Sequence, residues 1–84
     1  MTNIIRVKFK SPKHREDFAN IAWYNKTFEK FMPEEFLAEF RPNSRVQYIL
    51  VDVDGKKIEL PESEGGDGIT FDDEEFHLFM EQIK

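Results

Sequence analysis

Residues 45–60, RVQYILVDVDGKKIEL, decide the fold class of this chain. The run at residues 48–51 is apolar on both faces, which is typical of a central strand that is covered on both sides. The Asp-Gly pair at 54–55 is a signal for a hairpin turn. The segment after the turn alternates, and Ile58 and Leu60 are predicted to point inward. We therefore predict a strand at residues 45–53 that is central in the sheet, and a hairpin in which residues 56–60 return beside it.

A further strand is predicted at residues 3–9, where apolar and basic side chains alternate. Ile5, Val7 and Phe9 would share the covered face of this strand. The Ser-Pro pair at 11–12 then predicts a helix start, with serine as the N-cap and proline at the first helical position. The sequence therefore places a strand directly before the first helix.

The first helix carries one apolar stripe. The stripe contains Phe18, Ile21, Ala22, Phe28 and Met32. Asn25 falls in the same stripe, so we expect the helix to drift or to break near Tyr24-Asn25. Residues 33–40 are predicted to form a second helix, because Pro33 suits a first helical position and acids follow it.

The last third of the sequence predicts a loop and a well-capped helix. Residues 61–68, PESEGGDG, form the polar loop, and residues 69–71 suit a short extra strand. Asp72 and Glu75 have the spacing of a capping box. The apolar face of the helix that they begin contains Phe76, Phe79, Met80 and Ile83.

The predicted order of elements is β-α-α-β-β-α in one domain, residues 1–84. This order indicates an α+β fold. We expect a three-stranded sheet, or a four-stranded one if residues 69–71 add a strand. The sheet would be antiparallel or mixed, with the helices on one face.

Composition excludes several classes of protein. The chain has 84 residues and no cysteine, which excludes a disulfide scaffold, a zinc–thiolate site and a cysteine nucleophile. No apolar run approaches the roughly 18 residues of a membrane span, and the N-terminus lacks the apolar core of a signal peptide. We therefore expect a soluble, cytoplasmic domain that does not bind a membrane.

The residue types that catalysis needs are not arranged in known motifs. His14 and His77 are the two histidines, and none of the three serines lies in a nucleophile motif. Residues 63–74 have the length of an EF-hand loop, but its first and third positions, Ser63 and Gly65, supply no carboxylate. Phosphate-binding glycine motifs are absent. We expect no enzymatic activity, no catalytic residue, no metal site and no cofactor.

The net charge of −5 hides an asymmetry between the two parts of the chain. Residues 1–31 carry a net charge of +4, and residues 32–84 carry −9. Such a split is typical of a bipolar surface or an acidic interaction face. Charges that only solvate exposed faces would produce the same count. The split favours binding over catalysis as the function.

RNA binding is one hypothesis. Its candidate residues are Arg6, Lys8, Lys10, Lys13 and Arg15, which lie in the first strand and at the start of the first helix. Trp23 and Tyr24 would add surface for stacking of bases. The order of elements resembles the KH RNA-binding domain, which clamps RNA with a GxxG loop between its first two helices. The matching stretch, residues 25–35, contains no glycine, and the acidic second half disfavours long polyanions.

Protein binding is the hypothesis that we place first. Trp23 lies off the apolar stripe, and Leu78 lies opposite the apolar face of the last helix, so both suit interface anchors. Acids in the loop would complement a basic partner surface. The expected partner-binding residues are Trp23, Tyr24, Glu62, Glu64, Asp67 and Leu78. The alternative, that Trp23 packs in the core, stays open at this point.

As a whole, the chain resembles the small early proteins of T-even-type bacteriophages, because it is short, free of cysteine, acidic, rich in phenylalanine and densely charged. The resemblance implies a stoichiometric inhibitor or modulator of a host protein or nucleoprotein, of the counter-defence type, in the host cytoplasm. It carries over no functional residue. The charge split also suits head-to-tail association of copies of the chain, which predicts homo-oligomers that weaken as salt rises.

Overall fold

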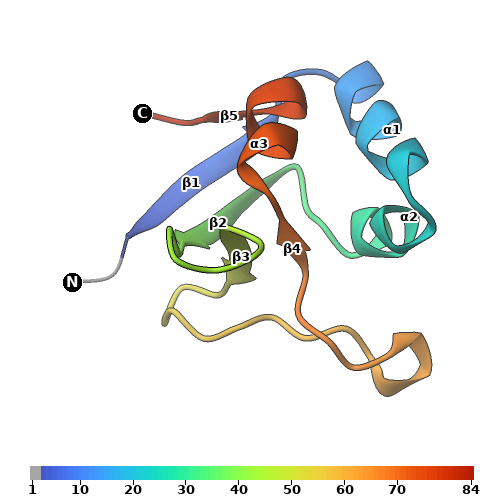
Figure 1. Ribbon diagram of the computed structural model, residues 1–84, viewed down its shortest axis with the longest axis vertical. Coiled ribbons are helices and arrows are strands. Elements are labelled where there is room, and N and C mark those ends of the chain that lie inside the picture. Colours follow the sequence, from blue (N-terminus) through green and yellow to red (C-terminus); the bar gives the residue numbers. More distant parts are fainter. Residues whose placement is uncertain (1–2) are drawn as a thin grey trace.

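The chain forms one antiparallel sheet with helices packed against it (Figure 1). The computed structural model describes residues 3–84. In chain order the elements are β1 (Ile4–Phe9), α1 (Pro12–Ile21), α2 (Trp23–Lys30), β2 (Glu35–Phe40), β3 (Tyr48–Val51), the 3-10 helix η1 (Glu62–Glu64), β4 (Thr70–Phe71), α3 (Asp73–Phe79) and β5 (Met80–Gln82). The predicted α+β class is confirmed, with five strands in place of three or four.

The strand order is β4-β3-β2-β1-β5, and every neighbouring pair is antiparallel. The predicted N-terminal strand, β1, lies between β2 and β5. Val7 is opposite Phe36 of β2 on one side and Gln82 of β5 on the other. Lys8, which points to the opposite face, is flanked in the same way by Glu35 and Glu81. One face of the sheet is therefore apolar and the other is charged along β1.

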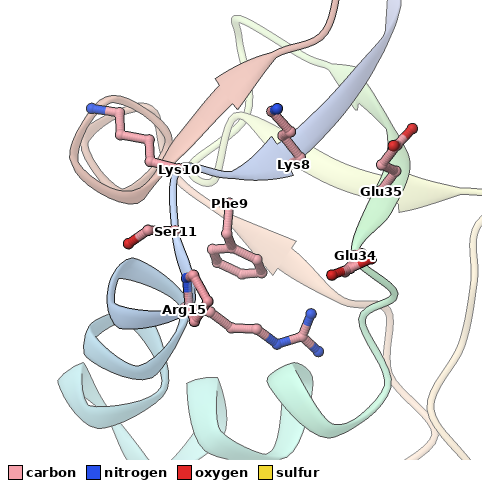
Figure 2. A pocket seen from close by; sticks show the side chains of 8 residues that line it. Lys8, Phe9, Lys10, Ser11, Arg15, Glu34 and Glu35 are labelled. Atoms are coloured by element: carbon pink, nitrogen blue, oxygen red, sulfur yellow. The ribbon is translucent and has the colours of Figure 1, made fainter.

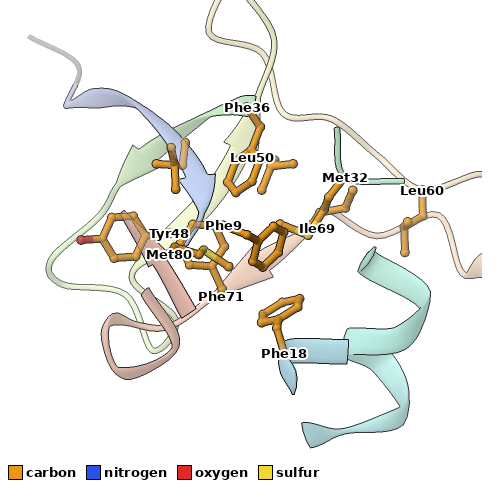
Figure 3. Close-up of a cluster of buried hydrophobic side chains, with 12 residues drawn as sticks. Phe9, Phe18, Met32, Phe36, Tyr48, Leu50, Leu60, Ile69, Phe71 and Met80 are labelled. Carbon is orange, nitrogen blue, oxygen red and sulfur yellow. The ribbon is translucent and has the colours of Figure 1, made fainter. Parts of the chain in front are cut away.

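The apolar face is covered by the helices, as the sequence predicts (Figure 3). Phe18 of α1 is fully buried, and Phe28 of α2 and Phe79 of α3 pack against the same cluster. The cluster of buried residues contains Val7, Phe9, Phe18, Met32, Phe36, Ala38, Tyr48, Leu50, Leu60, Ile69, Phe71 and Met80. Burial of this apolar surface is the main force that holds the helices on the sheet.

Local sequence signals place several boundaries correctly. Ser11 caps α1, and its side chain accepts a hydrogen bond from the backbone N–H of His14. Asp72 and Glu75 form the reciprocal capping box that begins α3. The turn at Asp54-Gly55 forms, and Gly55 has a φ of 81°, a backbone conformation that favours glycine. These features depend only on neighbouring residues, which is why sequence patterns predict them.

The break between the first two helices lies earlier than predicted. Ala22 is extended, with φ −151° and ψ 154°, so α1 ends at Ile21 and α2 begins at Trp23. The stripe is interrupted there, and Ile21 is exposed instead of facing the core. Asn25 does face inward, and it is buried in the first turn of α2. The chain therefore turns a corner between two short helices.

The prediction of a helix at residues 33–40 is wrong, because this segment forms β2. Alternation decides the outcome, since Phe36 and Ala38 are buried and Phe40 packs against the core cluster. As a strand, the segment pairs with β1 on one side and β3 on the other, which satisfies its backbone hydrogen-bonding groups. Such long-range pairing overrides the weak local helix signal.

Two further segments differ from the sequence-based expectation. The last helix ends at Phe79, and Met80 begins β5, because the chain pairs with β1 there instead of completing another helical turn. Residues 56–60 do not form a regular strand. They make isolated bridges, such as Val51 with Lys57, although Leu60 is buried as predicted.

Candidate functional site

The junction of α1 and α2 exposes a group of large apolar side chains, which we call the Trp23 corner: Ile21, Trp23 and Tyr24. Trp23 is 81% exposed, so the open question about its position is answered in favour of the surface. Its ring meets the ring of Tyr24 edge-on, with centroids 5.8 Å apart. Tyr24 in turn packs edge-on against Phe28, which is part of the core layer. The indole is therefore exposed to solvent, and the ring of Tyr24 connects it to the core layer.

Asn25 fixes the corner to the rest of the fold. Its side chain is 1% exposed, and Nδ2 donates to the backbone carbonyl of Phe18, at 3.1 Å, and to Oε2 of Glu75, at 2.6 Å. The other oxygen of Glu75 accepts the N–H of Asp72 in the capping box of α3. Oδ1 of Asn25 has no hydrogen-bond partner within residues 3–84. One amide thus links the last part of α1, the first turn of α2 and the start of α3.

Arg15 closes the other end of α2. Its guanidinium donates to the side chain of Glu29, at 3.1 Å, and to the backbone carbonyls of Glu29, Met32 and Pro33. The guanidinium also lies over the ring of Phe9, 5.3 Å from its centroid. These carbonyls lie in the last turn of α2 and just beyond it, where the regular hydrogen bonds of the helix end. The role of Arg15 in this structure is to hold α1 against the end of α2.

A groove of about 480 Å³ runs between the outer sides of α1 and α2. Its lining residues are Pro12, Arg15, Glu16, Ala19, Asn20, Lys26, Glu29 and Lys30. On α1 the lining ends at Asn20, and on α2 it starts at Lys26. This end of the groove is therefore close to the Trp23 corner, although none of the three corner residues lines the groove. Lys26 and Lys30 are exposed, and neither forms an ion pair with any residue of the described chain.

Two of the five basic residues predicted to bind RNA lie on the charged face of the sheet. Arg6 pairs with Glu35, with its Nη2 2.8 Å from a carboxylate oxygen, and Lys8 lies 3.9 Å from Glu81. Both pairs are cross-strand neighbours set by the register of β1. The pairs are half-exposed, so solvent weakens them.

Lys10 and Lys13 also make contacts within the chain. Nζ of Lys10 donates to the backbone carbonyl of His77, at 2.7 Å, near the end of α3. Lys13 pairs with Asp17 one turn along α1, at 2.8 Å. The hydrogen bond to Asp17, and then its charge, raise the pKa of Lys13 above its ordinary value. Like the pairs on the sheet, these contacts lie at the surface.

A second groove, of about 540 Å³, brings three of the five bases together (Figure 2). Lys8, Lys10 and Arg15 line it around Phe9, but Glu34 and Glu35 line it as well, and Glu35 is the cross-strand partner of Lys8. Arg6 and Lys13 do not line this groove. The basic cluster predicted from sequence spacing is therefore divided, and acids accompany the part that gathers.

The three acidic residues that are expected to contact a partner lie in a loop between β3 and β4. Glu62, Glu64 and Asp67 are exposed in the loop around η1, which extends from the body at the lower right of Figure 1. The base of this loop is closed by a 2.8 Å hydrogen bond from Leu60 N–H to the carbonyl of Asp67. Leu78 is also exposed, on α3.

A small polar cluster near the start of α3 shows no arrangement for catalysis. Asp73 lies 3.4 Å from the hydroxyl of Tyr48 and 3.4 Å from Nε2 of His77. Burial, and then the charge of Asp73, raise the pKa of Tyr48 above its ordinary value. His77 is mostly exposed, and neither groove described above includes the cluster. Within residues 3–84 no group of three or more ligating side chains is placed to hold a metal ion.

Sequence reasoning missed part of this site. Ile21 was predicted to face the core, and Lys26 and Lys30 were not singled out. One signal was present, because Trp23, Lys26 and Lys30 have the spacing of one helix face once α2 begins at Trp23. The position of the break at Ala22 was needed to recognise it.

The structure thus defines an α+β fold with an exposed aromatic corner. Comparison of the chain with protein-family models, with curated proteins and with solved structures found no match. No helix in residues 3–84 is long and apolar enough to cross a membrane.

Proposed function

We propose that this chain is a non-enzymatic binding module that inhibits or modulates another protein stoichiometrically, and that the Trp23 corner is its contact surface. The observation that carries the proposal is the 81% exposure of Trp23, the single tryptophan of the chain. A large apolar side chain in water costs free energy unless a partner covers it, and tryptophan is enriched among the residues that dominate protein interfaces.

The arrangement around Trp23 supports this reading. Asn25 and Arg15 hold the two ends of α2, so the indole is carried by a backbone that is fixed before any partner binds. Such preorganisation reduces the entropy lost on association. The overall resemblance to small early phage proteins agrees with a host protein as the partner and with action in the host cytoplasm.

Trp23→Ala should strongly weaken partner binding while leaving the fold intact. Affinity purification of the tagged full chain from its native host, with and without nuclease, should recover a protein that survives nuclease treatment. The variant should retain this protein about tenfold less well or worse. Because Trp23 is a surface residue, the free energy of unfolding of the variant should stay within about 0.5 kcal/mol of the wild-type value.

Val53→Ala provides the matched control, because Val53 is 89% exposed in the hairpin turn and lies outside the corner. This variant should bind the partner as the wild type does. Retention of the partner at wild-type level by Trp23→Ala would show that the corner is not the contact surface.

RNA binding is the second candidate, and the groove around Phe9 favours it, because Lys8, Lys10 and Arg15 gather there. The variant that combines Lys8→Glu with Lys10→Glu should then lose salt-dependent binding to a labelled single-stranded RNA in an electrophoretic shift assay. Unchanged binding by this variant, or no shift with wild-type protein at low salt, would remove the candidate. Arg15 is left unchanged in this test because its contacts with the end of α2 are expected to stabilise the fold.

A further inference from the structure

We infer that the groove between α1 and α2 binds an acidic polypeptide segment whose apolar side chain covers Trp23. This inference rests on the proposed function and names the chemistry of the partner. It starts from the position of the groove, whose lining residues Asn20 and Lys26 flank the Trp23 corner in the sequence. A chain that lies in the groove would therefore pass beside the indole.

The Trp23 corner lies next to one end of the groove and is apolar. Trp23, Ile21 and Tyr24 are 81%, 53% and 48% exposed. Single exposed apolar residues are normal on protein surfaces, but here Trp23 and Tyr24 are in ring contact and a third exposed apolar residue, Ile21, precedes them in the chain, which favours an anchor point. A leucine-like or aromatic side chain of a partner would be desolvated together with the indole.

The charges of the residues that line the groove favour a negatively charged partner. Arg15 and Glu29 neutralise each other, with Nε 3.1 Å from the carboxylate. Glu16 forms no ion pair in residues 3–84, so it offsets part of the remaining positive charge. Lys26 and Lys30, which share the face of α2 that bears Trp23, remain without an ion pair in residues 3–84. Two uncompensated ammonium groups therefore attract carboxylates along this rim.

The same features favour a polypeptide over RNA in this groove. Nucleic-acid affinity depends on neutralising several phosphates, and the groove has two free bases and two acidic lining residues, Glu16 and Glu29. The anchor also includes Ile21, which offers apolar contact but no stacking plane. A segment with a few carboxylates and an apolar side chain satisfies both parts of the surface.

The test uses the full-length chain and a labelled synthetic peptide of mixed glutamate and leucine. The readouts are peptide anisotropy and the emission of Trp23, the only indole present. The peptide should shift this emission to shorter wavelength, and its affinity should fall as salt rises. A peptide with glutamine in place of glutamate should bind about tenfold more weakly or worse, and so should the variant Lys26→Glu with Lys30→Glu.

The matched control is the variant Lys56→Glu with Lys57→Glu, which makes the same change of net charge at two exposed lysines of the hairpin segment. It should bind the peptide as the wild type does. Equal losses in the two double variants would show a general charge effect and overturn the inference. Absence of any emission shift with the glutamate–leucine peptide would also overturn it.

Two other occupants would be recognised in the same experiment. Binding of poly(U) that Lys26→Glu with Lys30→Glu abolishes, without peptide binding, would assign the groove to RNA. A concentration-dependent dimer in sedimentation that this variant dissolves would assign it to a second copy of the chain. Each result overturns the inference. If the native partner is lost by Trp23→Ala but kept by the lysine variant, the proposed function stands and the inference fails.

Discussion

Asn25→Asp should lower the free energy of unfolding by about 3 kcal/mol or more at neutral pH. The substitution replaces a donor amide with a carboxylate at a position that is 1% exposed and 2.6 Å from the carboxylate of Glu75. It also removes the donor to the carbonyl of Phe18. A buried carboxylate that faces another one loses solvation and gains repulsion, so the native state becomes much less favourable.

The effect should depend on pH in a defined direction. Burial and the facing carboxylate raise the native-state pKa of the introduced carboxyl above its unfolded value. The loss of stability is therefore small below the unfolded pKa and grows as pH rises through the window up to the native pKa. Urea denaturation at several pH values measures this trend.

Asn43→Asp is the matched control, because Asn43 is exposed in the loop between β2 and β3. The same chemical change there should alter stability by no more than about 0.5 kcal/mol. If the two substitutions cost the same, Asn25 does not link the helices in the way described.

Arg15→Ala should lower the free energy of unfolding by about 2–4 kcal/mol. The substitution leaves the backbone carbonyls of Glu29, Met32 and Pro33 without this donor, and it removes the cation that lies over Phe9. Arg15→Lys should restore only a small part of the loss, because one ammonium cannot reproduce the planar fork of the guanidinium. Thermal or urea denaturation gives the comparison.

Lys13→Ala provides the control on the same helix. Lys13 pairs with Asp17 at the surface, and such pairs contribute about 0.5 kcal/mol or less. A cost for Arg15→Ala that is as small as the cost for Lys13→Ala would mean that the contacts of Arg15 do not stabilise the end of α2.

These two residues also connect stability to the proposed function. Asn25 holds the first turn of α2 and Arg15 holds its last, so either variant should disturb the Trp23 corner by loosening the helix. Loss of partner binding in these variants would come with loss of stability. Trp23→Ala is expected to lose partner binding without losing stability, because it removes the contact surface and leaves the contacts of Asn25 and Arg15 in place.

Features that depend on nearby residues were predictable from the sequence. The alternation of β1, the cap at Ser11 and the capping box of α3 are of this kind. The strand nature of β2 was not predictable in this way, because its pairing partners β1 and β3 are far away in the chain. The same holds for β5. Its first residues continue the helical pattern of the sequence, but they pair with β1 as a strand.

The candidate site shows the same division. Trp23 could be recognised because it departs from the apolar stripe of its helix. The basic residues near the N-terminus looked like one cluster, but tertiary partners separate them: Arg15 turns toward the end of α2, and Arg6 pairs across the sheet. Spacing along a strand and a helix start does not contain the information about which acids and carbonyls will be close.

The most direct test of the central claim uses Trp23 as its own reporter. The partner recovered by affinity purification is titrated into the chain, and quenching of the tryptophan emission by acrylamide is followed. The signal of Trp23 is isolated either by using a partner without tryptophan or by labelling the indole of Trp23 so that it can be excited selectively. Because Trp23 is 81% exposed in the free chain, quenching should be strong at the start. The account predicts that quenching falls as the complex forms. Full complex formation with unchanged quenching would contradict it.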